Sequence, residues 1–358
     1  MSATPSFGRA RSIDPAWLAA AEPEEVLDPD LPIIDTAHHL YGPTAPPGTY
    51  LLEEYLHDLA GGHRVVASVY VECGSFFRPS GPEYLRPLGE TEAVSGLAAI
   101  AESGAYGPTR VGAAIVGKVD LAHPDAGAAL DAHLAIGGGR FRGVRDPAAY
   151  DSDPSVGNWS TSEGPGRYVS AEFRRGAQEL FARGLTLDAL VFFHQLHDVV
   201  DLAQAFPEGG IVLGHCGSPL GYGPYTDRDE VFRIWRTHMT ELARCPNVRV
   251  KLGGMMIRLA AFDYLNSPRP ATSTQLHRAW APYLDTCLEL FGPQRCMVES
   301  NLPIEKVGIT PKALFNTLKR SVAGGSPAEK DAVLSGTALD FYRLDPDLLA
   351  GPASAEPN

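Results

Sequence analysis

Cysteine is scarce in this chain of 358 residues, and its five cysteines are scattered without a Cys-x-x-Cys pair. That pattern gives no cysteine-based structural zinc signature and fits reduced thiols in a cytoplasmic protein. No run of about 18 apolar residues occurs, so we expect no membrane span. The first residues also lack an apolar core of signal-peptide length. We therefore predict a cytoplasmic protein.

Positive charge is also in short supply. The chain has 30 Lys and Arg against 43 Asp and Glu, which gives a formal net charge of −13. This acidic balance argues against nucleic acid or an anionic membrane as a partner. A small-molecule substrate remains the expected partner, because a local basic pocket can exist in an acidic protein. A homodimer is a possible assembly, since dimers are the commonest oligomers.

What the sequence does contain is a regular alternation of strand-like and helix-like segments. Eight apolar, β-branched runs begin near residues 32, 64, 111, 141, 186, 211, 247 and 295, and helical segments separate them. Such alternation predicts parallel strands joined by right-handed crossovers, and eight units is the count of a closed barrel. A doubly wound open sheet is the alternative, but no Gly-x-Gly-x-x-Gly turn follows the first strand.

We therefore predict an α/β protein with a single (β/α)8 TIM barrel over residues 31–344. Residues 1–30 are expected to form an N-terminal extension and residues 345–358 a C-terminal tail. Long βα loops, above all residues 146–168, would surround the barrel mouth. Aromatic residues expected near that mouth favour an aromatic or partly apolar substrate; they are Tyr70, Phe76, Phe77, Trp159, Tyr222 and Tyr225.

Polar side chains stand at the expected carboxyl ends of these strands, which converge on one face of such a barrel. Histidines and carboxylates there could bind a metal, move protons or hold a substrate. Arginine suits recognition of a carboxylate or an ester carbonyl. The residues so placed are Asp35, His38, His39, Glu72, Arg142, Arg145, His194, His215, Lys251, Glu299, Ser300 and Asn301.

Five stretches carry a resemblance to a known family. They are residues 32–41 (Pro-Ile-Ile-Asp-Thr-Ala-His-His-Leu-Tyr), 193–196 (Phe-His-Gln-Leu), 211–219 (Ile-Val-Leu-Gly-His-Cys-Gly-Ser-Pro), 245–254 (Cys-Pro-Asn-Val-Arg-Val-Lys-Leu-Gly-Gly) and 296–303 (Cys-Met-Val-Glu-Ser-Asn-Leu-Pro). The chain resembles the amidohydrolase-related, lactonase-like TIM-barrel proteins, often labelled predicted metal-dependent hydrolases. The resemblance implies the barrel fold and hydrolysis of a lactone, and wider relatives include metal-dependent decarboxylases of aromatic acids.

Two residues depart from the pattern of that family. Its first strand usually reads Asp-x-His-His-His, with the first and third histidines on a metal, but here the first of these is Ala37 and only His39 matches its partner. The usual aspartate of the eighth strand is Asn301, and an amide is neither a base near neutral pH nor a good anionic ligand. We therefore expect no obligatory metal. The alternative is zinc or manganese on His39, His194 and His215, with Glu299 or His38 shifted in.

Without an obligatory metal, a side chain must activate water and fixed donors must polarise the carbonyl. We predict that Glu299 is the general base of a lactone hydrolase, with His39 and His215 as acid or orienting groups. Asp35 is expected to lie near Glu299, so that the two carboxyls raise one another's pKa. The expected substrate contacts are His38, Glu72, Arg142, Arg145, His194, Lys251 and Asn301.

Two other hypotheses stay open. A rebuilt site in the same barrel permits a decarboxylase or another lyase, since the fold does not fix the function. Carbon dioxide release without water-derived oxygen in the product would identify that chemistry. A non-catalytic binding barrel that has lost its metal would instead hold its ligand unchanged.

Overall fold

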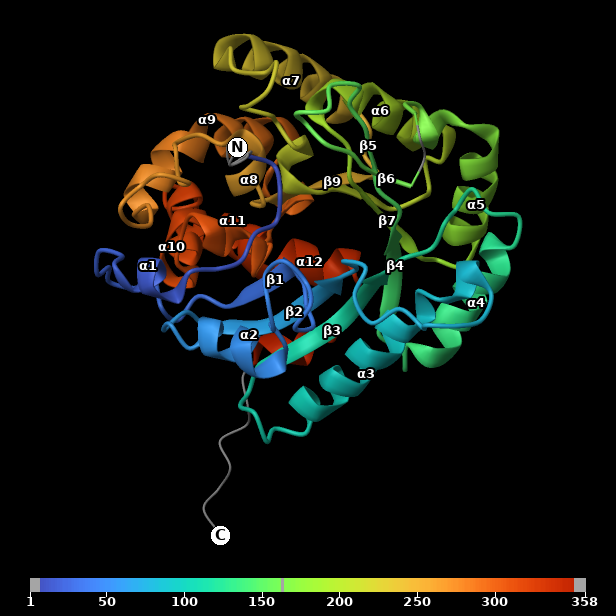
Figure 1. The fold of residues 1–358 in the computed structure, drawn as a ribbon, viewed down its shortest axis with the longest axis horizontal. Helices are drawn as coiled ribbons and strands as arrows, with labels where there is room; N and C mark the ends of the chain where they lie inside the picture. Colours follow the sequence, from blue (N-terminus) through green and yellow to red (C-terminus); the bar gives the residue numbers. More distant parts are fainter. Residues whose placement is uncertain (1–6, 162–163, 351–358) are drawn as a thin grey trace, which may run out of the picture.

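The computed structural model describes residues 7–161 and 164–350, and it confirms the predicted barrel (Figure 1). Eight parallel strands form one sheet in the order β1-β2-β3-β4-β7-β8-β9-β10. A bridge between His38 and Leu302 joins the first strand to the segment after the last. The strands are β1 (Ile33–His38), β2 (Val65–Val71), β3 (Arg110–Gly117), β4 (Phe141–Arg145), β7 (Thr186–Ala189), β8 (Ile211–Leu213), β9 (Val248–Leu252) and β10 (Cys296–Val298).

The strands are short, apolar and buried on both faces, as parallel strands covered by helices must be. All six residues of β1 are buried, for example. Closure at the carboxyl end rests on backbone bonds between the first and last strands: His39 N–H donates to the Leu302 carbonyl at 2.8 Å, and Asn301 N–H donates to the Ala37 carbonyl at 2.8 Å. This closure brings residues 35–39 beside residues 299–302.

Helices cover the outside of the barrel (Figure 1). Four of these helices begin after a residue whose side chain accepts a hydrogen bond from a backbone N–H group of the first turn, as is favoured at helix starts. The capping residues are Ser170, Asp227, Thr272 and Thr310. The covering helices are α2 (Leu52–Leu59), α3 (Leu88–Glu102), α4 (Ala126–Ile136), α5 (Ala171–Ala182), α6 (Leu196–Ala205), α7 (Arg228–Leu242), α9 (Ser273–Phe291) and α10 (Pro311–Ser321).

The C-terminal helical region packs against the amino-terminal end of the barrel. This region consists of α11 (Pro327–Asp331), a π-helical turn (Ala332–Gly336) and α12 (Thr337–Phe341). Phe341 and Tyr342 form a separate apolar cluster with barrel residues such as Ile34, Val69 and Met297. This cluster fills the barrel below the carboxyl-terminal mouth.

The described part of the N-terminal extension, residues 7–30, contacts the rest of the chain near the mouth. It contains the short helix α1 (Pro15–Ala19), whose first turn is capped by Asp14. Its start reaches α8 (Met256–Leu259) beside the mouth, where Gly8 N–H donates to the Ile257 carbonyl at 3.0 Å. The Phe7 ring lies edge-on to Tyr264. The extension therefore helps to build the rim of the mouth.

Two further details concern the loops. The long connection 146–168 holds a small antiparallel pair, β5 (Ala148–Ala149) and β6 (Trp159–Ser160). The fifth and sixth barrel strands are shorter than expected, so that His194 and His215 lie in 3-10 turns after the strands. None of the helices in the described ranges is long and apolar enough to cross a membrane.

Candidate active site

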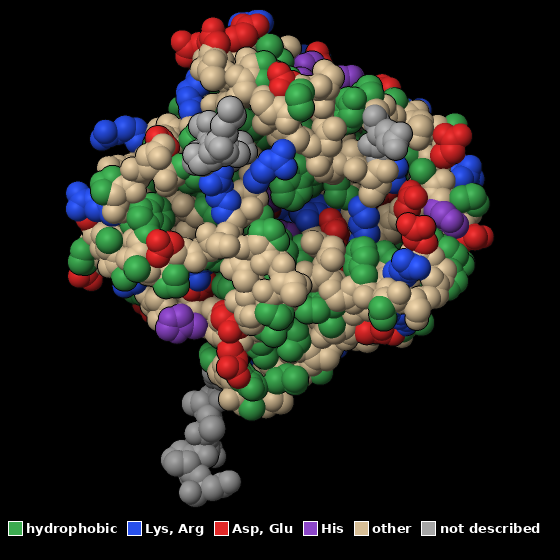
Figure 2. Space-filling view, viewed as in Figure 1, with side chains coloured by type: hydrophobic (Ala, Val, Ile, Leu, Met, Phe, Trp, Pro, Cys, Tyr) green, Lys and Arg blue, Asp and Glu red, His purple; other side chains and the backbone are tan. Residues whose placement is uncertain are grey.

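The mouth at the carboxyl ends of the strands holds a pocket of about 320 Å³. Figure 2 shows the hollow in the middle of this face, with cationic and acidic side chains inside it. Three cationic residues line it, Lys118, Arg145 and Arg258, and Glu72 is the sole acidic residue among its described lining. The walls also include Tyr41, Phe77, Trp159, Leu190, Ile257 and Ile304. The pocket is thus cationic and partly apolar.

His215 stands at the edge of this pocket on a strained turn. Non-glycine residues rarely adopt a positive φ, yet His215, Cys216 and Ser218 have φ values of 53°, 50° and 47°. Such strain costs energy and clusters at functional sites. Gly254 packs so closely that a Cβ atom there would lie 1.9 Å from His215 Nδ1. A glycine at this position is therefore required for the ring to take its place.

Glu299 holds the His215 ring. One carboxylate oxygen, Oε1, accepts from His215 Nδ1 at 2.6 Å and from the His215 backbone N–H at 2.8 Å. This contact places the proton on Nδ1, because a carboxylate can only accept. The ring nitrogen Nε2 has no hydrogen-bond partner among the described residues, so it is the atom of the pair left to exchange a proton with the pocket. The pair has the geometry of an imidazole base oriented by a carboxylate.

The structure places Glu299 behind His215 rather than at the surface of the pocket, where a general base would lie. Glu299 is 1% exposed and is not among the residues that line the pocket. Burial by itself would raise the pKa of the carboxyl, but the charge and hydrogen bonds of His215 lower it below its ordinary value. A buried carboxylate that binds His215 and does not itself line the pocket has the geometry of an orienting group. The position suited to a general base is His215 Nε2.

His39 is bonded through both ring nitrogens. Nδ1 lies 2.8 Å from the Val71 carbonyl, so it must donate. In the structure as it stands, Nε2 lies 3.0 Å from Asn301 Oδ1, and Asn301 Nδ2 donates to Glu305 Oε1 at 3.1 Å. Burial, followed by the charge of Arg145, lowers the pKa of His39 well below its ordinary value, so the ring is neutral.

This chain of contacts assigns a proton to Glu305. A neutral His39 that donates through Nδ1 needs a donor at Nε2, which the Asn301 NH2 group supplies when the amide is rotated by 180°. The Asn301 oxygen then faces Glu305 and requires a donor. Burial raises the pKa of Glu305 to about 8, which makes it a carboxylic acid at neutral pH and supplies that donor. His39 is thereby fixed as a neutral, hydrogen-bonded wall residue.

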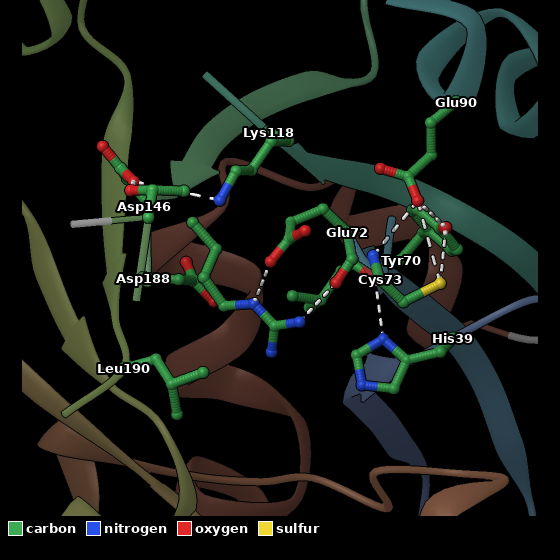
Figure 3. A network of polar contacts seen from close by, with 12 residues as sticks. His39, Tyr70, Glu72, Cys73, Glu90, Lys118, Asp146, Asp188 and Leu190 are labelled. Carbon is green, nitrogen blue, oxygen red and sulfur yellow. Dashed lines mark hydrogen bonds and ion pairs between the residues drawn. The ribbon is translucent and has the colours of Figure 1, made fainter. Parts of the chain in front are cut away.

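Arg145 and Glu72 form an ion pair in the lining of the pocket. Arg145 Nε donates to Glu72 Oε1 at 2.7 Å, and a second N–H reaches the Glu72 backbone carbonyl. The neighbouring loop is held by Glu90, whose Oε1 accepts from Tyr70 OH at 2.9 Å and from Cys73 N–H at 3.1 Å (Figure 3). These contacts fix the guanidinium of Arg145 at the bottom of the mouth.

Sequence reasoning missed Arg258, which comes from α8 after the seventh strand. Arg258 is 3% exposed as a residue, and its guanidinium carbon lies 4.3 Å from the Trp159 ring centroid and 5.4 Å from that of Phe192. Tyr222 contributes a hydrogen bond, and the Gly8 carbonyl accepts at 3.4 Å, but no carboxylate pairs with Arg258 in the described part of the chain. Burial lowers its pKa. An arginine several residues beyond a strand gives no periodic signal, which is why the sequence did not reveal it.

Lys118, also missed, is the third cation of the pocket. Its Nζ lies 3.9 Å from an oxygen of Asp146, which Arg167 already binds at 2.6 Å (Figure 3). The Lys118 ammonium is therefore only loosely neutralised by Asp146. It follows β3 directly, and a lysine after an apolar run could have been added to the strand-end residues.

Several residues expected at the site lie elsewhere. Arg142 points to the opposite end of the barrel, where its Nε donates to the Tyr342 carbonyl at 3.0 Å. Lys251 is buried in the barrel interior, bonded to Asp188 at 2.6 Å and to the Thr36 carbonyl at 2.7 Å. Neither side chain lines the mouth. Both arise from the barrel strands, but their side chains leave the strand in directions that the sequence does not specify.

The first strand also differs from expectation. His38 is buried: its ring stacks on Tyr55 and its Nδ1 lies 3.1 Å from the Val69 carbonyl, while burial lowers its pKa to about 3. Asp35 accepts from Tyr55 OH at 2.7 Å and from Ser300 Oγ at 2.6 Å. Burial raises its pKa to about 6, whereas the pKa of Glu299 is lowered. The expected mutual rise of these two carboxyls is therefore wrong, and Asp35 ties the first strand to the last.

The donor set does not suit a metal of the family type. His194 Nε2 binds Asp151 at 2.9 Å and its ring stacks on Tyr225, outside the lining of the pocket. Both nitrogens of His39 are already bonded, and position 37 is alanine. Within residues 7–161 and 164–350, no three His, Cys, Asp or Glu side chains are grouped so as to hold an ion. The ligand set proposed from the sequence is therefore not assembled.

The proton on Glu305 makes a prediction about stability. Its pKa is raised from 4.5 to about 8, so the folded state binds this proton more tightly than the unfolded chain does. The free energy of unfolding should therefore fall as the pH rises from about 4.5 to about 8, and Glu305→Gln should flatten part of that fall. Urea unfolding at several pH values measures it, with exposed Glu208→Gln as the control. A Glu305→Gln curve parallel to the wild-type curve would show that Glu305 is ionised.

Comparison with known proteins places this geometry in context. A family model described as "Amidohydrolase" matches residues 97–344. An uncharacterised protein, y4mH, of Sinorhizobium fredii is 30% identical over 83% of this chain and 86% of its own length. An L-fucono-1,5-lactonase of Burkholderia multivorans is 30% identical over 49% of this chain and 56% of its own length.

A solved structure of an amidohydrolase also matches this fold. A crystal structure of a Burkholderia multivorans amidohydrolase with bound zinc superposes with a TM-score of 0.67 at 27% identity. The match covers 87% of this chain and 99% of that one. That relative was crystallised with zinc, whereas the described residues of this chain assemble no group of three side chains that could hold an ion.

Proposed function

This chain belongs to the amidohydrolase family and is an enzyme, and we propose that it is a lactonase whose substrate carries a carboxylate. One observation carries the proposal. His215 is fixed by a buried, ionised Glu299 so that its free Nε2 is available at the edge of a cationic pocket. The similarity to an L-fucono-1,5-lactonase supports the choice of a cyclic ester.

Water activation is the first requirement of the reaction. His215 Nε2 takes a proton from a water molecule as the water oxygen attacks the lactone carbonyl. Glu299 accepts from Nδ1 and stabilises the imidazolium that forms, because the carboxylate is already ionised. The imidazolium then returns the proton to the ring oxygen as its bond to the carbonyl carbon breaks. The product is a hydroxy acid with one oxygen from water.

The carbonyl oxygen needs donors when it becomes negative. Arg145 uses Nε and one terminal nitrogen on Glu72, and its other terminal nitrogen has no partner in the described part of the chain and can donate. The Lys118 ammonium offers a further positive charge on the same pocket. Such fixed donors stabilise an oxyanion without a reorganisation cost. Because this chemistry uses side chains alone, a metal is not an obligatory part of the proposal.

The carboxylate preference rests on Arg258. A buried charge without a counter-ion is costly, and an anion from the substrate would remove that cost. The Trp159 and Phe192 rings hold the guanidinium in place by cation–π contact. The remaining apolar lining, including Tyr41, Phe77 and Ile257, suits the carbon skeleton of the substrate.

The function is tested with a panel of paired lactones, each with and without a carboxylate, in 18O-labelled water. We expect turnover with one labelled oxygen in the product, activity that survives chelation, and a preference for the carboxylated members. Release of carbon dioxide without label would replace the proposal by a decarboxylase. Loss of activity on chelation, with stoichiometric zinc or manganese in the purified protein, would replace the side-chain mechanism.

Arg258 gives a separate prediction about specificity. Arg258→Gln should lower kcat/KM about 10- to 100-fold for a carboxylated lactone, since a hydrogen bond to a charged group contributes about 1.5–3 kcal/mol. The effect should fall mainly on KM. The uncarboxylated partner lactone is the internal control, and its kcat/KM should be unchanged. Equal losses on both lactones would mean that Arg258 only supports the fold of the mouth.

A further inference from the structure

A second and larger cavity lies at the opposite end of the barrel. It is a groove of about 890 Å³, bounded by the starts of β2, β3 and β4 and by the turn at residues 343–348. Because the strands are parallel, their starts lie a full strand length from the mouth. The two cavities share no lining residue. The groove is therefore separate from the proposed active site.

Arginine dominates the charges of this groove. Its five arginines face three acidic residues, Glu102, Asp345 and Asp347. The chain as a whole carries a net charge of −13, so a local excess of positive charge runs against its composition. The arginines are Arg64, Arg110, Arg140, Arg142 and Arg343.

The contacts of these arginines divide them into two groups. Arg140 pairs with Glu102, and Arg64 donates to the Leu349 carbonyl at 2.8 Å and to the Asp30 carbonyl at 3.3 Å. Arg110 and Arg343 have no hydrogen bond or ion pair from their side chains within the described ranges. Their guanidinium groups are therefore available to a ligand.

Arg142 is intermediate between the bonded and the unbonded arginines of the groove. Only its Nε is used, on the Tyr342 carbonyl, which leaves both terminal nitrogens without a partner among the described residues. Burial lowers the pKa of Arg142, and the charge of Arg343 lowers it further. The two guanidiniums thus repel one another, and neither forms an ion pair with a carboxylate among the described residues.

The backbone at Arg343 adds a second observation. Arg343 has a φ of 51°, a left-handed conformation at the end of α12 where glycine or asparagine is favoured. An arginine in this conformation raises the conformational free energy of the folded chain, as any non-glycine residue with a Cβ atom does there. The Arg343 side chain makes no hydrogen bond or ion pair in the described structure that would offset this. A structural role in holding the C-terminal turn would need only Arg64 and Arg142, because these two bind its carbonyls.

We propose that this groove binds the phosphate group of a small anion through Arg110, Arg142 and Arg343. A guanidinium group can donate two parallel hydrogen bonds to the oxygens of a phosphate group. Several arginines around one point therefore suit a compact ligand with many acceptor oxygens. The groove also has an apolar wall of Val66, Ala113 and Leu348, and its volume lies within the range of small-molecule sites. The phosphate group could come from a free phosphate anion or from a phosphate ester.

The test is calorimetric titration of the full chain at low salt with three probes: inorganic phosphate, inorganic pyrophosphate and adenosine diphosphate. We expect saturable binding of at least one probe. Arg343→Gln should weaken that binding about tenfold or more, because it removes charged hydrogen bonds. Arg343 is exposed and unbonded, so this variant should keep the wild-type melting temperature. The double variant that carries both Arg142→Gln and Arg343→Gln should not bind the probe.

Two variants serve as controls, and the outcomes separate the alternatives. Arg258→Gln removes a cation of the mouth, and Arg236→Gln removes an exposed arginine outside both cavities; neither should change the affinity. Tighter binding of adenosine diphosphate than of pyrophosphate would identify an ester as the source, and the reverse order a free anion. The proposal is overturned by absence of saturable binding of all three probes, by an unchanged affinity in Arg343→Gln, or by loss in Arg258→Gln.

Discussion

Replacing His215 by asparagine is expected to lower kcat on a carboxylated lactone about 1,000-fold, in the middle of the range that a general base contributes. The amide of asparagine can still donate to Glu299 but has no basic nitrogen to take a proton from water. Because the His215 ring lies at the surface of the pocket and not in the apolar core, the fold should survive. Steady-state kinetics measures kcat, and circular dichroism shows whether the fold is retained.

His194 provides the matched control for this prediction. It is also a histidine in a turn after a barrel strand, and it also pairs with a carboxylate, Asp151, at 2.9 Å. It does not line the pocket, so His194→Asn should change kcat by less than about threefold if His215 is the base. Similar losses in both variants would contradict the assignment. A shift in the pH profile of kcat for Glu299→Gln would further identify Glu299 as a positioning residue.

Replacing Lys251 by methionine is expected to lower the free energy of unfolding by about 3–5 kcal/mol. The change leaves the Asp188 carboxylate in the barrel interior without the ammonium that binds it at 2.6 Å. Tyr342 OH, at 3.1 Å, would remain as its donor. Urea unfolding followed by fluorescence and circular dichroism gives the quantity directly.

The double variant with Asp188→Asn shows whether the uncompensated charge is the cause. Asparagine carries no charge and keeps a hydrogen-bond acceptor for Tyr342, so the double variant should regain a large part of the lost stability. A loss in Lys251→Met below 1 kcal/mol, or one that the double variant does not relieve, would show that the pair does not act as a buried ion pair. The readout is stability, since neither Lys251 nor Asp188 lines the pocket.

The barrel followed from the sequence because its signals are local and repeated. Each apolar run of four to eight residues and each capped helix is specified by neighbours along the chain, and eight repeats of the same unit leave few topologies. Because the carboxyl ends of the strands of such a barrel meet at one face, the residues at those ends were expected to lie together there. His39, Glu72, Arg145, His215 and Asn301 do line the pocket that the structure forms there.

The sequence did not specify which way each side chain leaves its strand. Arg142 and Arg145 lie three residues apart on β4, yet the first lines the groove at the amino-terminal end and the second lines the mouth. Lys251 near the end of β9 turns into the barrel and meets Asp188. Successive side chains on a strand point to opposite faces, and the register that decides between them is set by pairing with neighbouring strands.

The sequence by itself determined the fold class, the end of the barrel that carries the proposed chemistry, and the loss of two residues of the family metal pattern, Ala37 and Asn301. The tertiary structure decided which atom is free to act. Glu299 is buried behind His215, Glu305 is protonated by burial beside Asn301, and Arg258 reaches the pocket from α8. Burial and hydrogen-bond partners set protonation and access, and both depend on contacts between residues far apart in the chain.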